Sequence, residues 1–160
     1  MKKIMLIIIS VITLFTACKE SSIEQTEQVN YEESFNGITF GMTKEEVIAV
    51  LGRAPDYDFE SDIEYDKQVF LNVTADIINY GFNENGNLDS IRVMTLYEWA
   101  KEQMKIDLDH IKDELLKYYP ENTLTRIEEV DNELFLFTEN RMICLKTYDD
   151  AFDVYIAIRD

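Results

Sequence analysis

The chain has 160 residues, a formal net charge of −17 and a pI near 4.3. Phosphate groups and anionic membrane surfaces repel so acidic a protein, so we expect no nucleic-acid partner. Nine Tyr, nine Phe and one Trp exclude a disordered acidic chain, because such chains have few aromatic residues. We therefore expect a folded body.

The first residues have the pattern of a bacterial lipoprotein signal peptide. Lys2 and Lys3 precede an apolar stretch over 4–15, which is shorter than the ~20 residues that a membrane-spanning helix needs. Small residues then lead into Cys18. We predict that 1–17 is cleaved and that Cys18 becomes the lipidated first residue. The alternative is an ordinary secretory signal, which would leave Cys18 as a free thiol, an unfavourable state for an exported protein.

Lipid would then hold the mature protein at the membrane. Cleavage after residue 17 leaves 143 residues with a net charge of −19, so charge cannot attract the protein to an anionic surface. Residues 18–34 are polar and lack apolar periodicity, which predicts a flexible tether. The predicted location is the cell envelope, outside the cytoplasm. Lys19 rather than Asp follows Cys18, which favours the outer membrane in a cell that has one.

A short helix is predicted after the tether. Thr43 and Glu46 have the spacing of a capping box, in which each side chain accepts a hydrogen bond from the other residue's amide. Gly52 fits the left-handed residue that closes a helix, and Pro55 prevents its continuation. The predicted helix has roughly eight residues, too few to be stable alone, so it must pack against a sheet.

An acidic segment follows, in which every even-numbered residue from 56 to 66 is a carboxylate. An extended chain places these six side chains on one face and mainly aromatic and apolar side chains on the other. We predict that this acidic stripe binds a protein partner that can be cationic. The alternatives are the solvated side of an edge strand and a Ca²⁺ site. The residues of the stripe are Asp56, Asp58, Glu60, Asp62, Glu64 and Asp66.

Three strands complete the first half, over 69–73, 77–82 and 88–94. Asn85-Gly86 lies between the last two and is a strong signal for a hairpin turn. The first unit is predicted to span 35–96.

The second half is predicted to repeat this plan over 97–160. A shift of 64 residues places Ile111 on Val47 and a run over 134–138 on the run over 70–74. The helix of this half is predicted over 107–119. Thr95 and Glu98 form a second capping-box pattern, which predicts a further short helix over 97–104. The fold class predicted from this repeat is α+β, with two tandem units of a helix on an antiparallel sheet.

One sequence motif indicates a family. The segment Gly41-Met42-Thr43-Lys44-Glu45-Glu46-Val47, followed by Leu51-Gly52 and Pro55, resembles the motif of the small envelope lipoprotein family SmpA/OmlA. More widely, the chain looks like the β-lactamase-inhibitor-protein fold. That resemblance implies a helix packed on an antiparallel sheet, present twice in tandem. No residues match the contact surface of an inhibitor.

Other candidate sites have simpler explanations. Tyr97, Trp99 and Met104 could form an aromatic surface for a protein, although packing in the core is the favoured interpretation. Lipidation of Cys18 leaves Cys144 as the single remaining cysteine, expected to be a buried thiol in a strand. The single histidine, His110, is expected to be solvated.

No pattern of catalytic residues is present. The sequence lacks zinc-ligand spacing, a Gly-rich phosphate loop and a nucleophile elbow. We therefore predict no enzyme activity, no cofactor and no metal site. The predicted function is a membrane-anchored protein-binding or envelope-assembly module. The alternative is a lipoprotein inhibitor or immunity factor that neutralises a secreted enzyme or toxin.

Overall fold

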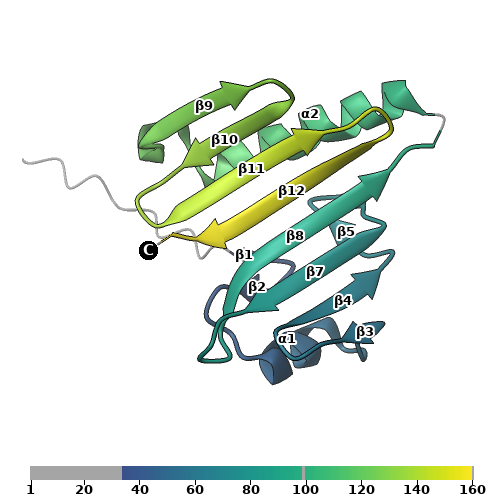
Figure 1. Ribbon diagram of the computed structural model, residues 1–160, viewed down its shortest axis with the longest axis vertical. Coiled ribbons are helices and arrows are strands. Elements are labelled where there is room, and N and C mark those ends of the chain that lie inside the picture. Colours follow the sequence, from purple (N-terminus) through teal and green to yellow (C-terminus); the bar gives the residue numbers. More distant parts are fainter. Residues whose placement is uncertain (1–33, 99, 160) are drawn as a thin grey trace, which may run out of the picture. The chain divides into compact units, whose positions relative to one another are not determined.

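The computed structural model of the protein describes residues 34–98 and 100–159 (Figure 1). These residues belong to one compact unit. The predicted signal peptide, Cys18 and the tether up to residue 33 lie outside the described residues, as does Trp99. Neither of the two helices in the described part is both long and apolar enough to cross a membrane.

A single antiparallel sheet of eight strands is the main feature of the fold (Figure 1). Its strand order is β3-β4-β7-β8-β12-β11-β10-β9. The last strands of the two halves of the chain, β8 and β12, pair in the middle of the sheet. The strands are β3 (Tyr57–Asp58), β4 (Asp62–Asp66), β7 (Ile77–Phe82), β8 (Leu88–Leu96), β9 (Arg126–Val130), β10 (Glu133–Phe137), β11 (Arg141–Thr147) and β12 (Ala151–Ile158).

The other elements cover one face of this sheet, and Figure 1 shows α2 behind the strands. Buried side chains of both helices and of two small hairpins join one hydrophobic core with side chains of the sheet. Phe35 of the first hairpin lies 5.4 Å from Phe70 of the second and 5.1 Å from Tyr118 of α2, between ring centroids. These elements are β1 (Ser34–Phe35), β2 (Ile38–Thr39), α1 (Lys44–Leu51), β5 (Val69–Phe70), β6 (Val73–Thr74), α2 (Lys101–Tyr118) and the 3-10 helix η1 (Glu121–Thr123).

The structure of α1 confirms the predicted capping signals. The Thr43 hydroxyl accepts a hydrogen bond from the Glu46 amide at 3.3 Å, and the Glu46 carboxylate accepts one from the Thr43 amide at 2.8 Å. Gly52 closes the helix with a φ of 68°, where a side chain would be strained. The helix has eight residues, and Val47 is fully buried against the sheet. Burying such a side chain contributes about 1.5–3 kcal/mol, which is why so short a helix is stable here.

The hairpin predicted around Asn85-Gly86 is also confirmed. Strands β7 and β8 pair antiparallel, and Gly86 has a φ of 76°. The Asn83 side chain accepts hydrogen bonds from the amides of Asn85 and Asn87 at 3.0 and 3.1 Å. These bonds fix the turn and therefore the register of the two strands.

The predicted fold class is wrong. The structure is mainly β, with one continuous eight-stranded sheet and two helices among the described residues, and not two tandem helix-plus-sheet units. The constant shift of 64 residues fails in the middle of each half. It places β10, which lies within the main sheet, on the separate hairpin β5–β6. Apolar runs of similar length produced the apparent match.

The second half also differs locally from its prediction. One helix, Lys101–Tyr118, replaces the two that were predicted over 97–104 and 107–119. Thr95 belongs to β8, and the residue that begins α2 is Ala100, which makes no side-chain capping bond. The second capping-box pattern was therefore misleading, because strand pairing with β12 claims Thr95.

Candidate functional site: the open face of the sheet

The face of the sheet away from the helices is the candidate site, and we call it the open face. Residues that pair directly across an antiparallel sheet point to the same side, so the register defines its members. The open face consists of Tyr57, Asp62, Glu64, Asp66, Ile77, Asn79, Gly81, Ser90, Arg92, Met94, Leu96, Arg126, Glu128, Val130, Glu133, Phe135, Phe137, Met142, Cys144, Lys146, Ala151, Asp153, Tyr155 and Ala157.

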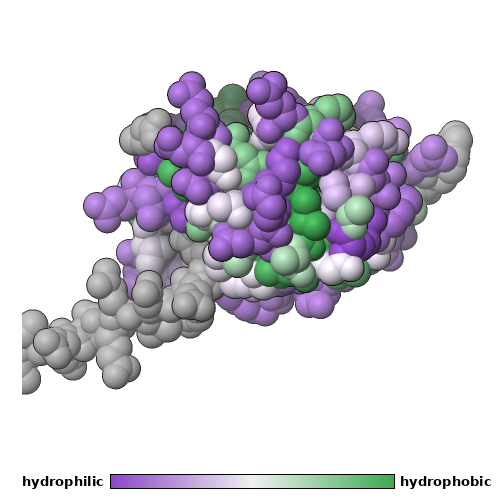
Figure 2. Space-filling view, turned by 90° about the horizontal axis from the view of Figure 1, so that it is seen from below, coloured by the Kyte–Doolittle hydropathy of each residue, from purple (hydrophilic) through white to green (hydrophobic). Residues whose placement is uncertain are grey.

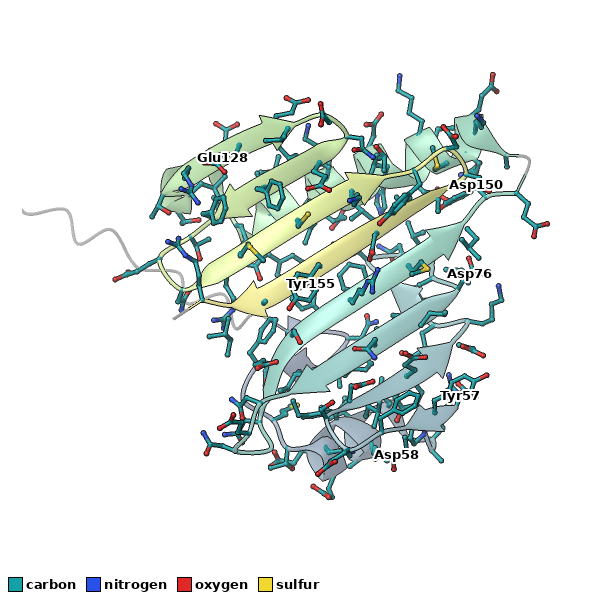
Figure 3. All side chains as sticks on the ribbon, viewed as in Figure 1. Tyr57, Asp58, Asp76, Glu128, Asp150 and Tyr155 are labelled. Atoms are coloured by element: carbon teal, nitrogen blue, oxygen red, sulfur yellow. The ribbon has the colours of Figure 1, made fainter. Side chains whose placement is uncertain are left out.

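One row of paired residues crosses the whole open face. It runs from Tyr57 on β3 to Glu128 on β9, with Tyr155 in the middle on β12, and Figure 3 labels these three. From one edge to the other, the row is Tyr57, Glu64, Asn79, Arg92, Tyr155, Cys144, Phe135 and Glu128. It passes from a polar to a more aromatic environment.

Much of the open face is apolar. Leu96 and Val130 are 51% and 54% exposed, and Met94, Met142 and Phe135 are partly exposed. An antiparallel sheet that faces water on one side ordinarily alternates apolar and polar residues. Apolar side chains on the uncovered side therefore indicate an interaction surface.

The cations in the middle of the open face belong to ion pairs. Arg92 donates to Asp153 from Nε at 2.9 Å and from Nη2 at 2.5 Å. The hydrogen bond to Asp153 raises the pKa of Arg92. Lys146 donates to Glu133, and this bond raises the pKa of Lys146. Both pairs bridge neighbouring strands, so they stabilise the sheet and leave little positive charge for a ligand.

The β4 end of the open face carries excess negative charge. The Asn79 side-chain amide donates to Asp62 at 2.8 Å and to Glu64 at 3.3 Å. Asp66 is exposed, and among the described residues no ion pair with a cation is found for the carboxylates of Asp62, Glu64 or Asp66. A neutral amide is therefore what holds two of these carboxylates in place.

The other half of the predicted acidic stripe lies elsewhere, because the chain reverses at Glu60 and Ser61 instead of staying extended. Asp56 accepts hydrogen bonds from the Asp66 amide and from Arg53, both at 2.8 Å, and these bonds lower the pKa of Asp56. Asp58 pairs with Lys44 of α1 at 3.0 Å. Glu60 is exposed in the turn. Of the six predicted residues, Asp62, Glu64 and Asp66 share the open face.

Two exposed aromatic rings flank this acidic end. Tyr57 and Phe59 are 54% and 50% exposed, and their rings stack with centroids 6.5 Å apart. Figure 2 views the molecule from below, the side on which α1 and β3 lie in Figure 1. The surface seen there is mostly hydrophilic, with a narrow band of hydrophobic side chains.

The remaining candidate residues are in different surroundings from those expected. Cys144 is partly exposed on the open face and not fully buried, and its partial burial raises the pKa of its thiol. His110 is partly buried, with Nε2 3.0 Å from the Leu71 carbonyl oxygen, and is not fully solvated. Tyr97 is buried and donates to Asp107 at 2.6 Å, and Met104 packs against the core, as the favoured interpretation predicted.

The sequence did contain a signal for the aromatic side of the open face. Residues 134–137 and 142–145 are continuous apolar runs, whereas a strand with one solvated face alternates. Such runs mean that both faces of β10 and β11 carry apolar side chains. We missed this because a short apolar run was interpreted only as core.

The described residues contain no group of three His, Cys, Asp or Glu side chains that could hold a metal ion. The calcium alternative for the acidic stripe therefore has no support from their arrangement. The larger surface hollow, about 640 Å³, lies beside Tyr97 and is lined by Glu98, Lys101, Asp149 and Asp150. It lacks the apolar lining that is typical of a small-molecule site.

The chain matches no protein-family model, and comparison with curated proteins and with solved structures found no significant similarity. The resemblance to the SmpA/OmlA family therefore stays a prediction from the motif.

Proposed function

We propose that the protein is a lipid-anchored extracytoplasmic module that binds a protein partner on its open face. The observation that carries this proposal is the row of apolar and aromatic side chains on the side of the sheet that no helix covers among the described residues. The predicted lipid on Cys18 would keep this face close to a membrane, and the tether would let it move to meet a partner.

The size of the open face suits a protein partner. The seven longer strands lie about 4.8 Å apart and average about six residues of about 3.3 Å each, so they cover roughly 700 Å². A standard protein interface buries about 800 Å² on each partner. A small metabolite would cover only a fraction of this surface.

Crosslinking in intact cells, followed by purification and mass spectrometry, tests the proposal. We compare the unchanged protein with Met94→Arg, which places a charge in the middle of the open face. The matched control is Ile106→Arg, because Ile106 is 60% exposed on α2, away from the open face. Thermal unfolding checks that both variants fold.

The proposal predicts one specific partner that is recovered with the unchanged protein and the control, and lost with Met94→Arg. Equal recovery with all three proteins would overturn it. Turnover of a small substrate without any specific partner would also overturn it. A partner that is a secreted enzyme or toxin, inhibited in proportion to the amount of this protein added, would select the alternative of an inhibitor or immunity factor.

A further inference from the structure

We propose that the partner presents a surface that is basic at one end and apolar at the other, with the basic end over β4 and the apolar end over β10 and β11. This inference rests on the proposed function, because it specifies the chemistry of the partner that the open face binds. It follows from how charge is distributed across the eight strands.

The cations of the open face are already occupied within the protein. Arg92 pairs with Asp153, Lys146 pairs with Glu133, and Arg126 lies 3.3 Å from Glu128. A partner with negative charge would therefore have to compete with carboxylates that are already in place. It would also be repelled by the mature chain as a whole, with its net charge of −19.

The carboxylates of β4 are in the opposite situation. Asp62 and Glu64 share one neutral donor, the Asn79 amide, and the Asp66 side chain is exposed. A fourth carboxylate is close to this group, since a Cβ on Gly81 would lie 3.9 Å from Asp89 Oδ1. A cationic side chain that approached this end would add charge-assisted hydrogen bonds without displacing any ion pair found in the described residues.

Flanking rings add to this complementarity. Tyr57 pairs with Glu64 across β3 and β4, and its ring stacks on Phe59. Exposed aromatic faces attract Lys and Arg side chains through cation–π contacts. Carboxylates and rings at the same edge therefore favour a basic residue over a neutral polar one.

The opposite end of the open face selects apolar groups. Phe135 on β10 and Met142 on β11 are partly exposed there. Four strand spacings separate β4 from β11, which is roughly 19 Å. The partner must therefore place basic and apolar side chains about 19 Å apart, which gives it one orientation on the sheet.

A peptide provides the probe. It has about 12 residues, enough at about 3.3 Å each to reach from β4 to β11, with lysines in one half and leucines in the other, on a Gly-Ser background. Two controls replace its lysines with glutamates or its leucines with serines. Binding is measured by fluorescence anisotropy at low salt, on the full chain carrying Cys18→Ser, in which Cys144 is the single thiol.

Two charge variants locate the bound peptide. The open-face variant combines Asp62→Asn, Glu64→Gln and Asp66→Asn. The control variant makes the same change in net charge on exposed residues elsewhere, with Glu102→Gln, Asp113→Asn and Glu121→Gln. Asp66→Lys is a second open-face variant, in case the triple change disturbs the sheet.

We expect the open-face variant to weaken binding of the lysine peptide about tenfold, since three exposed ion pairs contribute about 0.2–1 kcal/mol each. The control variant should weaken it less than about twofold, and added salt should weaken binding to the unchanged protein. The apolar half of the peptide should slow alkylation of Cys144, and the serine control peptide should not.

Equal weakening by both charge variants would overturn the inference, because attraction would then reflect only the total charge. Failure of the lysine peptide to bind would also overturn it. Neither result affects the proposed function, which depends on loss of the cellular partner with Met94→Arg. If that partner is lost with Met94→Arg and kept with the open-face charge variant, the proposed function stands and the inference is wrong.

Discussion

At the scale of single residues, Asp76 holds the end of the central strand β8. Its Oδ2 accepts a hydrogen bond from the Leu96 amide at 2.6 Å, and its Oδ1 pairs with Lys67. Burial raises the pKa of Asp76, but the bonds from Lys67 and Leu96 outweigh this effect, so the pKa lies below its usual value. The ionised carboxylate therefore stabilises the fold.

We expect Asp76→Asn to lower the free energy of unfolding by about 1–2 kcal/mol near pH 7. A carboxylate whose pKa is lowered by folding contributes fully above its unfolded value, about pH 4, and loses this contribution as the pH falls further. Denaturant unfolding of both proteins should therefore show a difference at pH 7 that shrinks at pH 3. Glu84→Gln, an exposed turn residue, is the control. A difference that is the same at both pH values would contradict this role.

No sequence pattern indicates this role of Asp76. Its partners are 20 and 9 residues away along the chain, and they are brought together by the pairing of β7 with β8. By contrast, Thr43 and Glu46 are three residues apart, and their contact was predicted because it is local. Residue roles that depend on distant pairing could not be predicted.

At the scale of elements, α1 depends on its capping box. We expect Thr43→Ala to lower the free energy of unfolding by about 1 kcal/mol, because the Glu46 amide then loses its acceptor. Chemical denaturation measures the change, with Thr74→Ala on the exposed end of β6 as a control. A stability equal to that of the unchanged protein would show that packing of Val47 alone fixes the helix.

The seam between β8 and β12 depends on one ion pair. The Asp153 side chain is 9% exposed and receives both of its printed hydrogen bonds from Arg92. Arg92→Met would leave this carboxylate mostly buried and unpaired, so we expect a loss of about 1–3 kcal/mol. Arg92→Met combined with Asp153→Leu should recover part of this loss, because no unpaired charge remains. If the double change is as unstable as the single one, the pair does not act in this way.

The elements show where prediction from sequence succeeded and failed. Asn85-Gly86 and Gly52 determine local backbone geometry, so the β7–β8 hairpin and the end of α1 were predicted. The turn between β3 and β4 uses Glu60 and Ser61, without Gly, Pro or Asn, so the acidic stripe was mistaken for one extended strand. The pairing of β8 with β12 joins residues about 60 positions apart, and missing it led to the wrong fold class.

At the scale of the whole molecule, the predicted lipid on Cys18 determines where the protein acts. We expect growth with labelled palmitate to label the unchanged protein and Cys144→Ala, and to leave Cys18→Ala unlabelled. Cys18→Ala should also move to the soluble fraction, because a mature chain with a net charge of −19 is repelled by anionic lipid. Label on Cys18→Ala, or its retention at the membrane, would refute the lipoprotein prediction.

The whole account depends on which face of the sheet meets the partner. Photo-crosslinking in living cells tests this most directly, with a photoreactive residue placed singly at Leu96 and Met142 of the open face and at Lys105 and Lys112 of α2. We predict that one partner is captured from Leu96 and Met142 and not from the two helix positions. Capture from the helix positions alone, or equally from all four, would contradict binding on the open face.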